Sequence, residues 1–280
     1  MGEIPAIRSI PPPYALTRFV EAFVHRREAA PPHVVRLLPE PRATIQITRG
    51  ASYWLREQGP AEPWRELPRI GLWGPRHRWA YGYAAGTLDT LGFGLTPEAF
   101  HALTGRAVPA FIDTVTPLAD IAPALAAALD TTAAEPFDTW RARALEPLRT
   151  IFAALPETTP FDPGLALLAT GEGDVVTRAA EATGLSERQY RRRFRDLCGV
   201  GPKTYQRALR VDRMLRQLHQ RPWETDAYAD TPLPFSDQPH AIREFRALTG
   251  LTPTAYVAAK RSGDATLRSV VMPDIDPPLV

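Results

Sequence analysis

Four arginines are predicted to share one face of a helix in the C-terminal third of the sequence: Arg188, Arg191, Arg192 and Arg195. The opposite face is apolar, because Tyr190, Phe194 and Leu197 recur at positions i, i+4 and i+7. A guanidinium group can donate two parallel hydrogen bonds to the edge of guanine, and the amide of the adjacent Gln189 can bind adenine in a similar way. The chemistry that these residues could perform is therefore recognition of base edges in the major groove of a duplex.

The helix that carries these arginines is expected to follow a tight turn. A short helix is predicted over 174–183, and Gly184 after it can adopt the positive φ that ends a helix. Ser186 is a good N-cap for the next helix, because its side-chain oxygen can accept a hydrogen bond from the first turn. A helix, a glycine turn and a second, capped helix form a helix-turn-helix unit.

The same unit occurs a second time, 51 residues later in the chain. Seven of the fifteen residues from Arg191 onward match their counterparts, among them the pairs Phe194/Phe245 and Gly199/Gly250. In the second copy Ser236 is the predicted N-cap. The residues expected to lie outward or at the edge are Gln238, His240, Ile242, Arg243 and Arg246. A polar helix face is often merely solvated, but its duplication favours recognition of two half-sites.

A continuous helix is predicted over 203–220, between the two units. At roughly 1.5 Å per residue it spans about 27 Å. Units joined by a helix of that length could enter successive major grooves, which lie roughly 34 Å apart on one side of a duplex. The segment 188–216 contains ten basic residues and two acidic ones, although the net charge of the whole chain is only +2. Such a positive field attracts phosphate, so the residues predicted to hold the backbone are Lys203, Arg207 and Arg210.

Residues from about 165 to 258 resemble the C-terminal DNA-binding domain of AraC/XylS-type bacterial transcription regulators. The most specific part of this resemblance is FSDQPHAIREFRALTGLTPTAY, which begins at Phe235. The resemblance implies that the first unit reads bases with Arg188, Arg191 and Arg192. It implies that the second unit reads them with Gln238, His240, Ile242 and Arg243.

One stretch departs from this resemblance. The sequence WETDAYADTPLPFSDQ places Pro232 and Pro234 where the family has a helix and its turn glycine. Proline cannot supply positive φ and removes a backbone donor. We therefore expect the first helix of the second unit to be shortened or replaced by a loop, and recognition to rest mainly on the first unit.

The first 155 residues are predicted to form a β-rich domain with flanking helices. Apolar residues at helical spacing predict a first helix over 14–25. Short extended runs between Pro- and Gly-rich breaks predict an antiparallel sheet or barrel, and they lie at 34–38, 43–49, 51–57, 69–74, 77–84 and 87–95. Helices are then expected after the N-cap Thr96 with a stop at Gly105, from Thr116 and Pro117 onward, and over 136–155.

Residues 10–125 more weakly resemble the N-terminal domain of one branch of the same regulators, which implies effector binding, dimerisation or both. Aromatic residues are concentrated here, and alternation along 77–83 places several of them on one face. Such a face is often only core, but inside a small barrel it could line an apolar pocket. The candidate effector residues are Trp54, Trp73, His77, Trp79 and Tyr81.

The predicted fold class is thus α+β, with two domains. We expect an effector-binding or dimerisation domain over 1–155, a linker over 156–164, a double helix-turn-helix domain over 165–262 and a disordered tail over 263–280. No histidine spacing typical of a metal site occurs, and no P-loop, nucleophile elbow or C-x-x-C, so the sequence favours neither an enzyme nor a cofactor. The single Cys198 excludes an internal disulfide framework.

The function predicted from these features is that of a sequence-specific DNA-binding transcription regulator in the bacterial cytoplasm. No secretory signal or apolar run long enough for a membrane helix is found. Its expected partners are double-stranded DNA, a small-molecule effector, a second copy of the chain and, for an activator, RNA polymerase. The alternative is an interaction or ligand-binding protein that does not bind DNA and retains the scaffold with a degenerate second unit.

Overall fold

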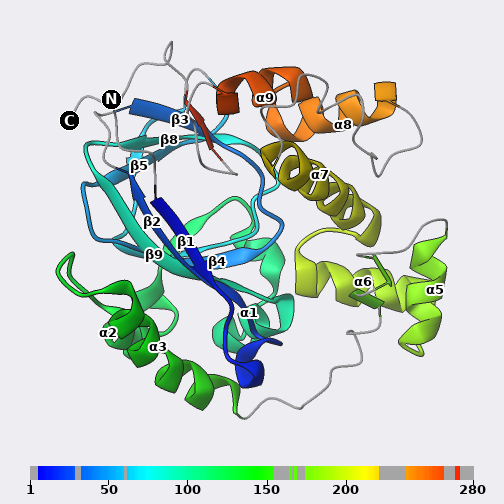
Figure 1. Cartoon of the computed structure of the whole chain (residues 1–280). Coiled ribbons are helices and arrows are strands. Elements are labelled where there is room, and N and C mark those ends of the chain that lie inside the picture. Colours follow the sequence, from blue (N-terminus) through cyan, green and yellow to red (C-terminus); the bar gives the residue numbers. More distant parts are fainter. Residues whose placement is uncertain are drawn as a thin grey trace.

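A computed structural model describes residues 6–28, 33–59, 62–153, 164–165, 167–168, 174–220, 238–261 and 269–271. A β-rich N-terminal domain lies beside a helical C-terminal domain, which confirms the predicted fold class (Figure 1). None of the described helices combines the length and the hydropathy that crossing a lipid bilayer would require.

Two antiparallel sheets form the N-terminal domain. The six-stranded sheet has the order β1 (Ala6–Ile10), β2 (Val20–Glu28), β9 (Leu88–Leu95), β4 (Ala43–Thr48), β7 (Ile70–Trp73) and β10 (Val115–Pro117). The five-stranded sheet has the order β11 (Ser269–Val271), β3 (His33–Leu37), β8 (Ala80–Ala84), β5 (Tyr53–Arg56) and β6 (Arg65–Glu66). Each of the extended runs predicted from the sequence corresponds to one of these strands.

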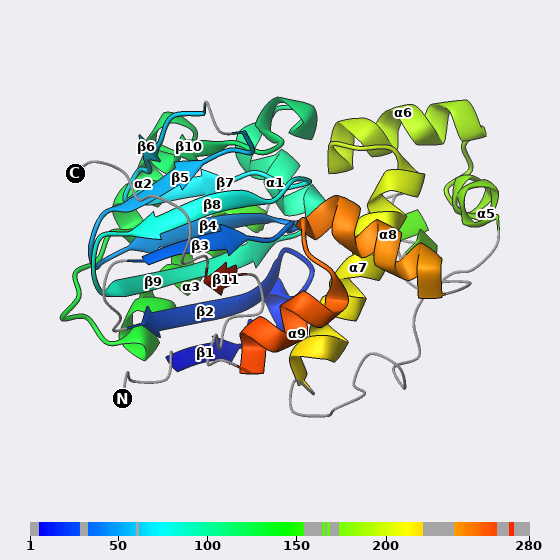
Figure 2. The same ribbon diagram turned by 90° about the horizontal axis from the view of Figure 1, so that it is seen from above.

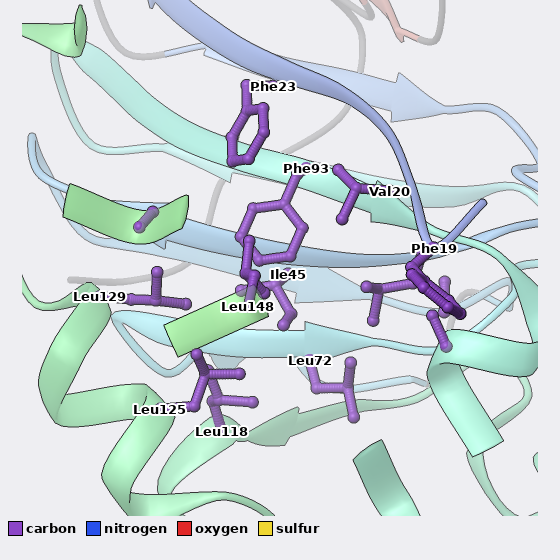
Figure 3. Close-up of a cluster of buried hydrophobic side chains, with 14 of the residues drawn as sticks. Phe19, Val20, Phe23, Ile45, Leu72, Phe93, Leu118, Leu125, Leu129 and Leu148 are labelled. Carbon is purple, nitrogen blue, oxygen red and sulfur yellow. The ribbon is translucent and has the colours of Figure 1, made fainter. Parts of the chain in front are cut away.

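Helices cover one face of the six-stranded sheet. They are α1 (Pro97–Thr104), α2 (Pro123–Leu129) and α3 (Phe137–Phe152). Along β4, Ile45 and Ile47 are fully buried toward these helices, whereas Thr44 and Gln46, which alternate with them, are half-buried and face the other way. Figure 3 shows Ile45 and Phe93 of the sheet packed near Leu148 in this core. The sheet therefore has its polar positions on the face that turns toward the second sheet.

The helix predicted over 14–25 is wrong. A 3-10 turn, η1 (Tyr14–Leu16), is followed by strand β2. The register of β2 against β9 shifts between Val20 and Phe23. Such a bulge puts two residues three apart on the same face of a strand, and both are fully buried in the helix-covered core. Their spacing imitates that of a helix because of the bulge.

The helix predicted after the N-cap Thr96 is confirmed as α1, and the helix predicted over 136–155 is confirmed as α3. Thr96 accepts a hydrogen bond from the amide of Ala99 at 3.3 Å, and Gly105 ends α1 with φ of +59°. The helix predicted from Thr116 and Pro117 is wrong at its start, since these residues belong to β10, which pairs with β7 at the edge of the sheet. Proline is tolerated at such an edge. After the short turn η3 (Leu118–Asp120), α2 begins only at Pro123.

The C-terminal domain consists of α5 (Val175–Ala182), α6 (Glu187–Cys198), α7 (Pro202–Gln220), α8 (Gln238–Thr249) and α9 (Pro253–Arg261). Helices α5 and α6 form the predicted first unit, and α7 is the predicted connecting helix. The stretch with Pro232, Pro234 and the expected N-cap Ser236 lies outside the described residues. The disordered tail predicted from residue 263 is wrong at Ser269–Val271, where the chain returns to the N-terminal domain as β11 and pairs with β3.

Candidate nucleic-acid interface and N-terminal cavity

Helix α6 is fixed at both ends by its own sequence. The side chains of Ser186 and Gln189 form a capping box, in which the Ser186 amide donates to Oε1 of Gln189 at 3.1 Å and the Gln189 amide donates to Oγ of Ser186 at 3.4 Å. At the other end Gly199 has φ of +83° and its amide donates to the carbonyl of Arg195 at 2.8 Å. Gln189, predicted to contact DNA, is therefore used in the cap.

The apolar side of α6 packs on α5, so the arginine face is turned outward. Tyr190 and Phe194 are fully buried with Ala179 and Ala180 of α5, whose small side chains allow the close crossing. All four arginines of the face are exposed, and with Glu187 they line one open hollow on the helix surface. We call Arg188, Arg191, Arg192 and Arg195 the arginine face.

One member of the arginine face has an internal partner. Nη2 of Arg191 donates to Glu187 at 2.8 Å, one helical turn away. The pKa of Glu187 lies below its usual value because its carboxylate accepts hydrogen bonds from Thr177, which has the larger effect, and from Arg191. Exposed pairs of this kind contribute little to stability, so Arg191 can exchange this partner for a nucleic-acid acceptor at small cost.

The three residues predicted to hold phosphate differ in their exposure and in their partners. Lys203 is exposed in the first turn of α7. Arg207 joins α7 to α8, since its Nη2 donates to Oε1 of Glu244 at 3.1 Å. Arg210 is half-buried, and burial lowers its pKa.

The second unit presents a smaller cationic surface. Arg243 and Arg246 of α8 are exposed, whereas His240 and Ile242 are half-buried. Gln238 is the first residue of α8. Phe245 is fully buried and anchors the helix on α7 and α9. Of the base-reading positions predicted in α8, Arg243 is thus the exposed cation.

Both units contact the N-terminal domain through the same position of the repeat. A Cβ on Gly199, after α6, would lie 3.0 Å from the side chains of Val108 and Ile112. A Cβ on Gly250, after α8, would lie 2.6 Å from Nε1 of Trp79. Nη1 of Arg36 also donates to the Gly250 carbonyl at 2.9 Å. The N-terminal domain therefore holds the C-terminal ends of both helices and leaves the arginine face in solvent.

Figure 2 shows the same arrangement from above, with α7, α8 and α9 beside the β-domain and α5 farthest from it. Helix α6 contacts α1 and the 3-10 helix η2 (Val108–Phe111). The thiol of Cys198, at the end of α6, is buried, and this burial raises its pKa well above the usual value. Cys198 is a packing residue at the domain junction.

A cavity of about 360 Å³ lies between the two sheets. Apolar side chains such as Val24, Leu37 and Phe93 line it, together with the charged side chains of Arg26, Glu40, Arg42 and Arg76. Its volume falls in the range of roughly 300–1,000 Å³ found for small-molecule sites. Among the described residues, no group of histidine, cysteine or acidic side chains is arranged to hold a metal ion.

Of the predicted effector residues, Trp73 lines this cavity. Trp54, Trp79 and Tyr81 lie instead in a separate aromatic cluster on the opposite face of the five-stranded sheet. Side chains alternate along β8, so Tyr81 pairs with Arg36 and Arg56 on the outer face, while the cavity side of the strand carries Gly82. The sequence predicts this alternation but assigns the aromatic face to the pocket, whereas Trp54, Trp79 and Tyr81 lie outside the cavity.

Two arginines of the same sheet pack their guanidinium groups over the rings of the aromatic cluster. The guanidinium carbon of Arg36 lies 4.2 Å from the centre of the Trp79 ring, and that of Arg56 lies 4.9 Å from the ring centres of Trp64 and Tyr81. Cation–π contacts at such distances stabilise a packed surface. His77 lies apart from both sites: its amide donates to Asp113 at 2.8 Å, and burial lowers the pKa of its ring.

Comparison with known families divides the chain in the same way. Residues 179–259 match a family described as a helix-turn-helix domain. Residues 8–117 match a family described as a domain of unknown function, DUF6597. No curated protein is significantly similar to the chain in sequence.

Solved structures share the overall arrangement only loosely. ToxT from Vibrio cholerae aligns with 84% of this chain and 98% of its own, with a TM-score of 0.47 and 7% identity. The unsaturated fatty acid-bound form of ToxT aligns with 84% of this chain and 94% of its own, with a TM-score of 0.43 and 8% identity. An oxalate decarboxylase aligns with 34% of this chain and 26% of its own, with a TM-score of 0.24 and 12% identity. Likenesses of this size carry no functional argument.

Proposed function

We propose, from the AraC-type helix-turn-helix domain that residues 179–259 form, that the protein is a sequence-specific transcription regulator. The observation that carries the proposal is the arginine face of α6. It is exposed, it lies on a helix capped at both ends, and the apolar side of that helix is buried on α5. An α-helix of this kind fits the major groove of B-DNA.

In this proposal Arg188, Arg191 and Arg192 contact base edges, and Lys203 holds the phosphate backbone. Each bidentate arginine contact to guanine contributes about 1–3 kcal/mol of discrimination against a wrong base. Helix α8 supplies Arg243 and Arg246 to a second groove. The exposed cations are fewer there, so the first unit carries most of the specificity.

The cavity supports a sensory role for the N-terminal domain. It has the volume of a small-ligand site, and its lining combines apolar surface with a few charged groups that could orient a ligand. We propose that a small molecule binds there and regulates DNA binding. A second copy of the chain and, for an activator, RNA polymerase are the protein partners that we propose, and the bacterial cytoplasm is the compartment.

The experiment that tests the function is a fluorescence-anisotropy titration of the full chain against its own promoter region and against random duplex. It is carried out at two salt concentrations, because contacts to phosphate alone give an affinity that depends on salt but not on sequence. We expect tighter binding to the promoter at both concentrations. Equal affinity for the two duplexes would reject sequence-specific recognition and favour the interaction-protein alternative.

The first prediction concerns Arg188. Arg188→Ala should weaken promoter binding by about 1–3 kcal/mol and relax the preference at one base pair. Arg193→Ala is the matched control, because Arg193 is an exposed arginine of the same helix that does not line the hollow of the arginine face. Anisotropy titrations on the promoter and on duplexes with single base changes measure both effects. An equal loss in the two variants would contradict a base-reading role for Arg188.

A further inference from the structure

The loop between β3 and β4, residues 38–42, forms a wall shared by the cavity and the C-terminal domain. Leu38 lines the cavity and is only 2% exposed. It also belongs to the apolar core of the second unit, where it packs with Val211 and Leu215 of α7 and with Tyr256 of α9. One side chain of the N-terminal domain thus completes a core of the DNA-binding domain.

Arg42, at the other end of this loop, also faces both sides. It lines the cavity and the narrow gap between the domains that Cys198 and Leu197 close from α6. Its Nε pairs with Glu21 at 2.5 Å. Its Nη1 lies 3.9 Å from Oδ2 of Asp212 in α7. A single guanidinium group therefore connects the lining of the cavity to the connecting helix.

The partner of Arg42 in α7 is a buried carboxylate. The side chain of Asp212 is 7% exposed, and Arg216 donates to it at 3.1 Å. Burial alone would lower the pKa of Arg42, but Glu21, Glu40 and Asp212 raise it overall, so the guanidinium stays charged. A buried carboxylate is costly to leave with fewer cations around it. The position of Arg42 consequently contributes to the docking of α7.

We propose that the loop 38–42 couples the cavity to the DNA-binding domain, and that an anionic group bound in the cavity beside Arg42 weakens the docking of α7. The anion competes with Asp212 for the guanidinium of Arg42. The buried Asp212 carboxylate then loses part of the positive charge that offsets its own. The ligand class that this assigns is a small molecule with an apolar body and an acidic group. The inference rests on the proposed effector role of the cavity, and it names the residues that transmit the signal.

Coupling of this kind is reciprocal, so undocking of α7 must also strengthen binding of the anion in the cavity. An experiment can therefore replace the unidentified ligand by a carboxylate built into the chain. Thr44 lines the cavity from β4, two residues after Arg42, which lines the same cavity from the end of the loop. Thr44→Glu places an anion beside Arg42, and Thr44→Gln places a neutral group of the same shape there.

The readout is hydrogen exchange of the α7 amides in the full chain without DNA. We expect exchange about fivefold faster or more in Thr44→Glu than in Thr44→Gln, which is the lower end of ordinary coupling between two sites. In an Arg42→Gln background the α7 amides of the two Thr44 variants should exchange at the same rate, because the guanidinium for which the anion and Asp212 compete is gone. Equal exchange of the Thr44 variants in the wild-type background would overturn the proposal.

If the glutamate introduced by Thr44→Glu unfolds the domain, near-ultraviolet circular dichroism detects the unfolding, and a second comparison then tests the proposal. Arg42→Gln should itself accelerate exchange in α7. Arg26→Gln removes another arginine of the cavity lining, from β2, and should leave α7 unchanged. Equal exchange in these two variants would also overturn the proposal. Because DNA is absent throughout, failure here is distinct from failure of promoter recognition.

Discussion

Three glycines of the C-terminal domain have the same backbone geometry but different surroundings. Gly184, Gly199 and Gly250 have φ values of +66°, +83° and +71°. A Cβ on Gly184 would meet nothing within 4 Å, whereas one on Gly250 would meet the Trp79 ring and Arg36 of the N-terminal domain. The left-handed conformation is thus required at all three positions, and a close approach of the two domains is added at Gly199 and Gly250 but not at Gly184.

The second prediction follows from this difference. Gly184→Ala should lower the free energy of unfolding by about 1–2 kcal/mol, the ordinary cost of left-handed backbone for a residue with a Cβ. Gly250→Ala should lower it further, because Trp79 or the loop must move. Urea unfolding followed by tryptophan fluorescence measures both variants. Equal losses of unfolding free energy in the two variants would show that the contact of Gly250 with Trp79 and Arg36 accommodates a Cβ without destabilising the protein.

At this scale the sequence predicts exposure better than it predicts partners. The arginine face follows from the spacing of Tyr190 and Phe194, because a helix with one apolar stripe must present its other side to solvent. The ion pair of Arg207 with Glu244 could not be predicted, since it joins residues 37 positions apart on helices whose crossing is set by tertiary packing. Gln189 shows a third case: a residue type that suits both a cap and a base contact is taken by the cap.

The elements of the first unit depend on local signals, and α6 is the best example. Its start is fixed by the capping box of Ser186 and Gln189. An interaction of this kind can be tested without touching the arginine face.

The third prediction is that Ser186→Ala destabilises the C-terminal domain by about 1 kcal/mol, through loss of the N-cap. Gln189→Glu should preserve stability, because glutamate serves equally at that position of a capping box. Urea unfolding followed by far-ultraviolet circular dichroism measures both. If Gln189→Glu were as destabilising as Ser186→Ala, the box would not be the feature that holds the end of the helix.

The strands β3, β4 and β9 could be predicted because their apolar runs are short and bounded by turn residues. Strand β2 could not, because its bulge between Val20 and Phe23 produces a spacing typical of a helix. Likewise, the sequence predicts alternation along β8 but not which face is covered. That depends on where the second sheet packs, and the other sheet is built from residues distant in the chain.

At the scale of the whole molecule, the two domains share side chains instead of meeting across a polar gap. Leu38 belongs to the core formed by α7, α8 and α9, and Gly250 is hydrogen-bonded to Arg36 of β3. Domains that share a core in this way are expected to unfold together.

The fourth prediction is therefore that Leu38→Ala separates the unfolding of the two domains. Truncating a buried leucine costs about 2–5 kcal/mol, and here the loss falls on the junction. Differential scanning calorimetry should show a single transition in the wild type and two in the variant. Val34→Ala is the control, because Val34 is buried in the aromatic cluster within the N-terminal domain. Two transitions in both variants, or one in both, would contradict the role assigned to Leu38.

The return of the chain at β11 means that the helical domain is an insertion between two parts of the β-domain. Val271 pairs with Val35, and Ser269 pairs with Leu37, so β11 covers the outer edge of β3. A truncation at residue 262, which the linear order of the domains would suggest, removes that cover and leaves a strand edge open to self-association. The helical domain is also joined to the β-domain through both of its ends, so any movement of it relative to the β-domain is restricted at two points of the chain.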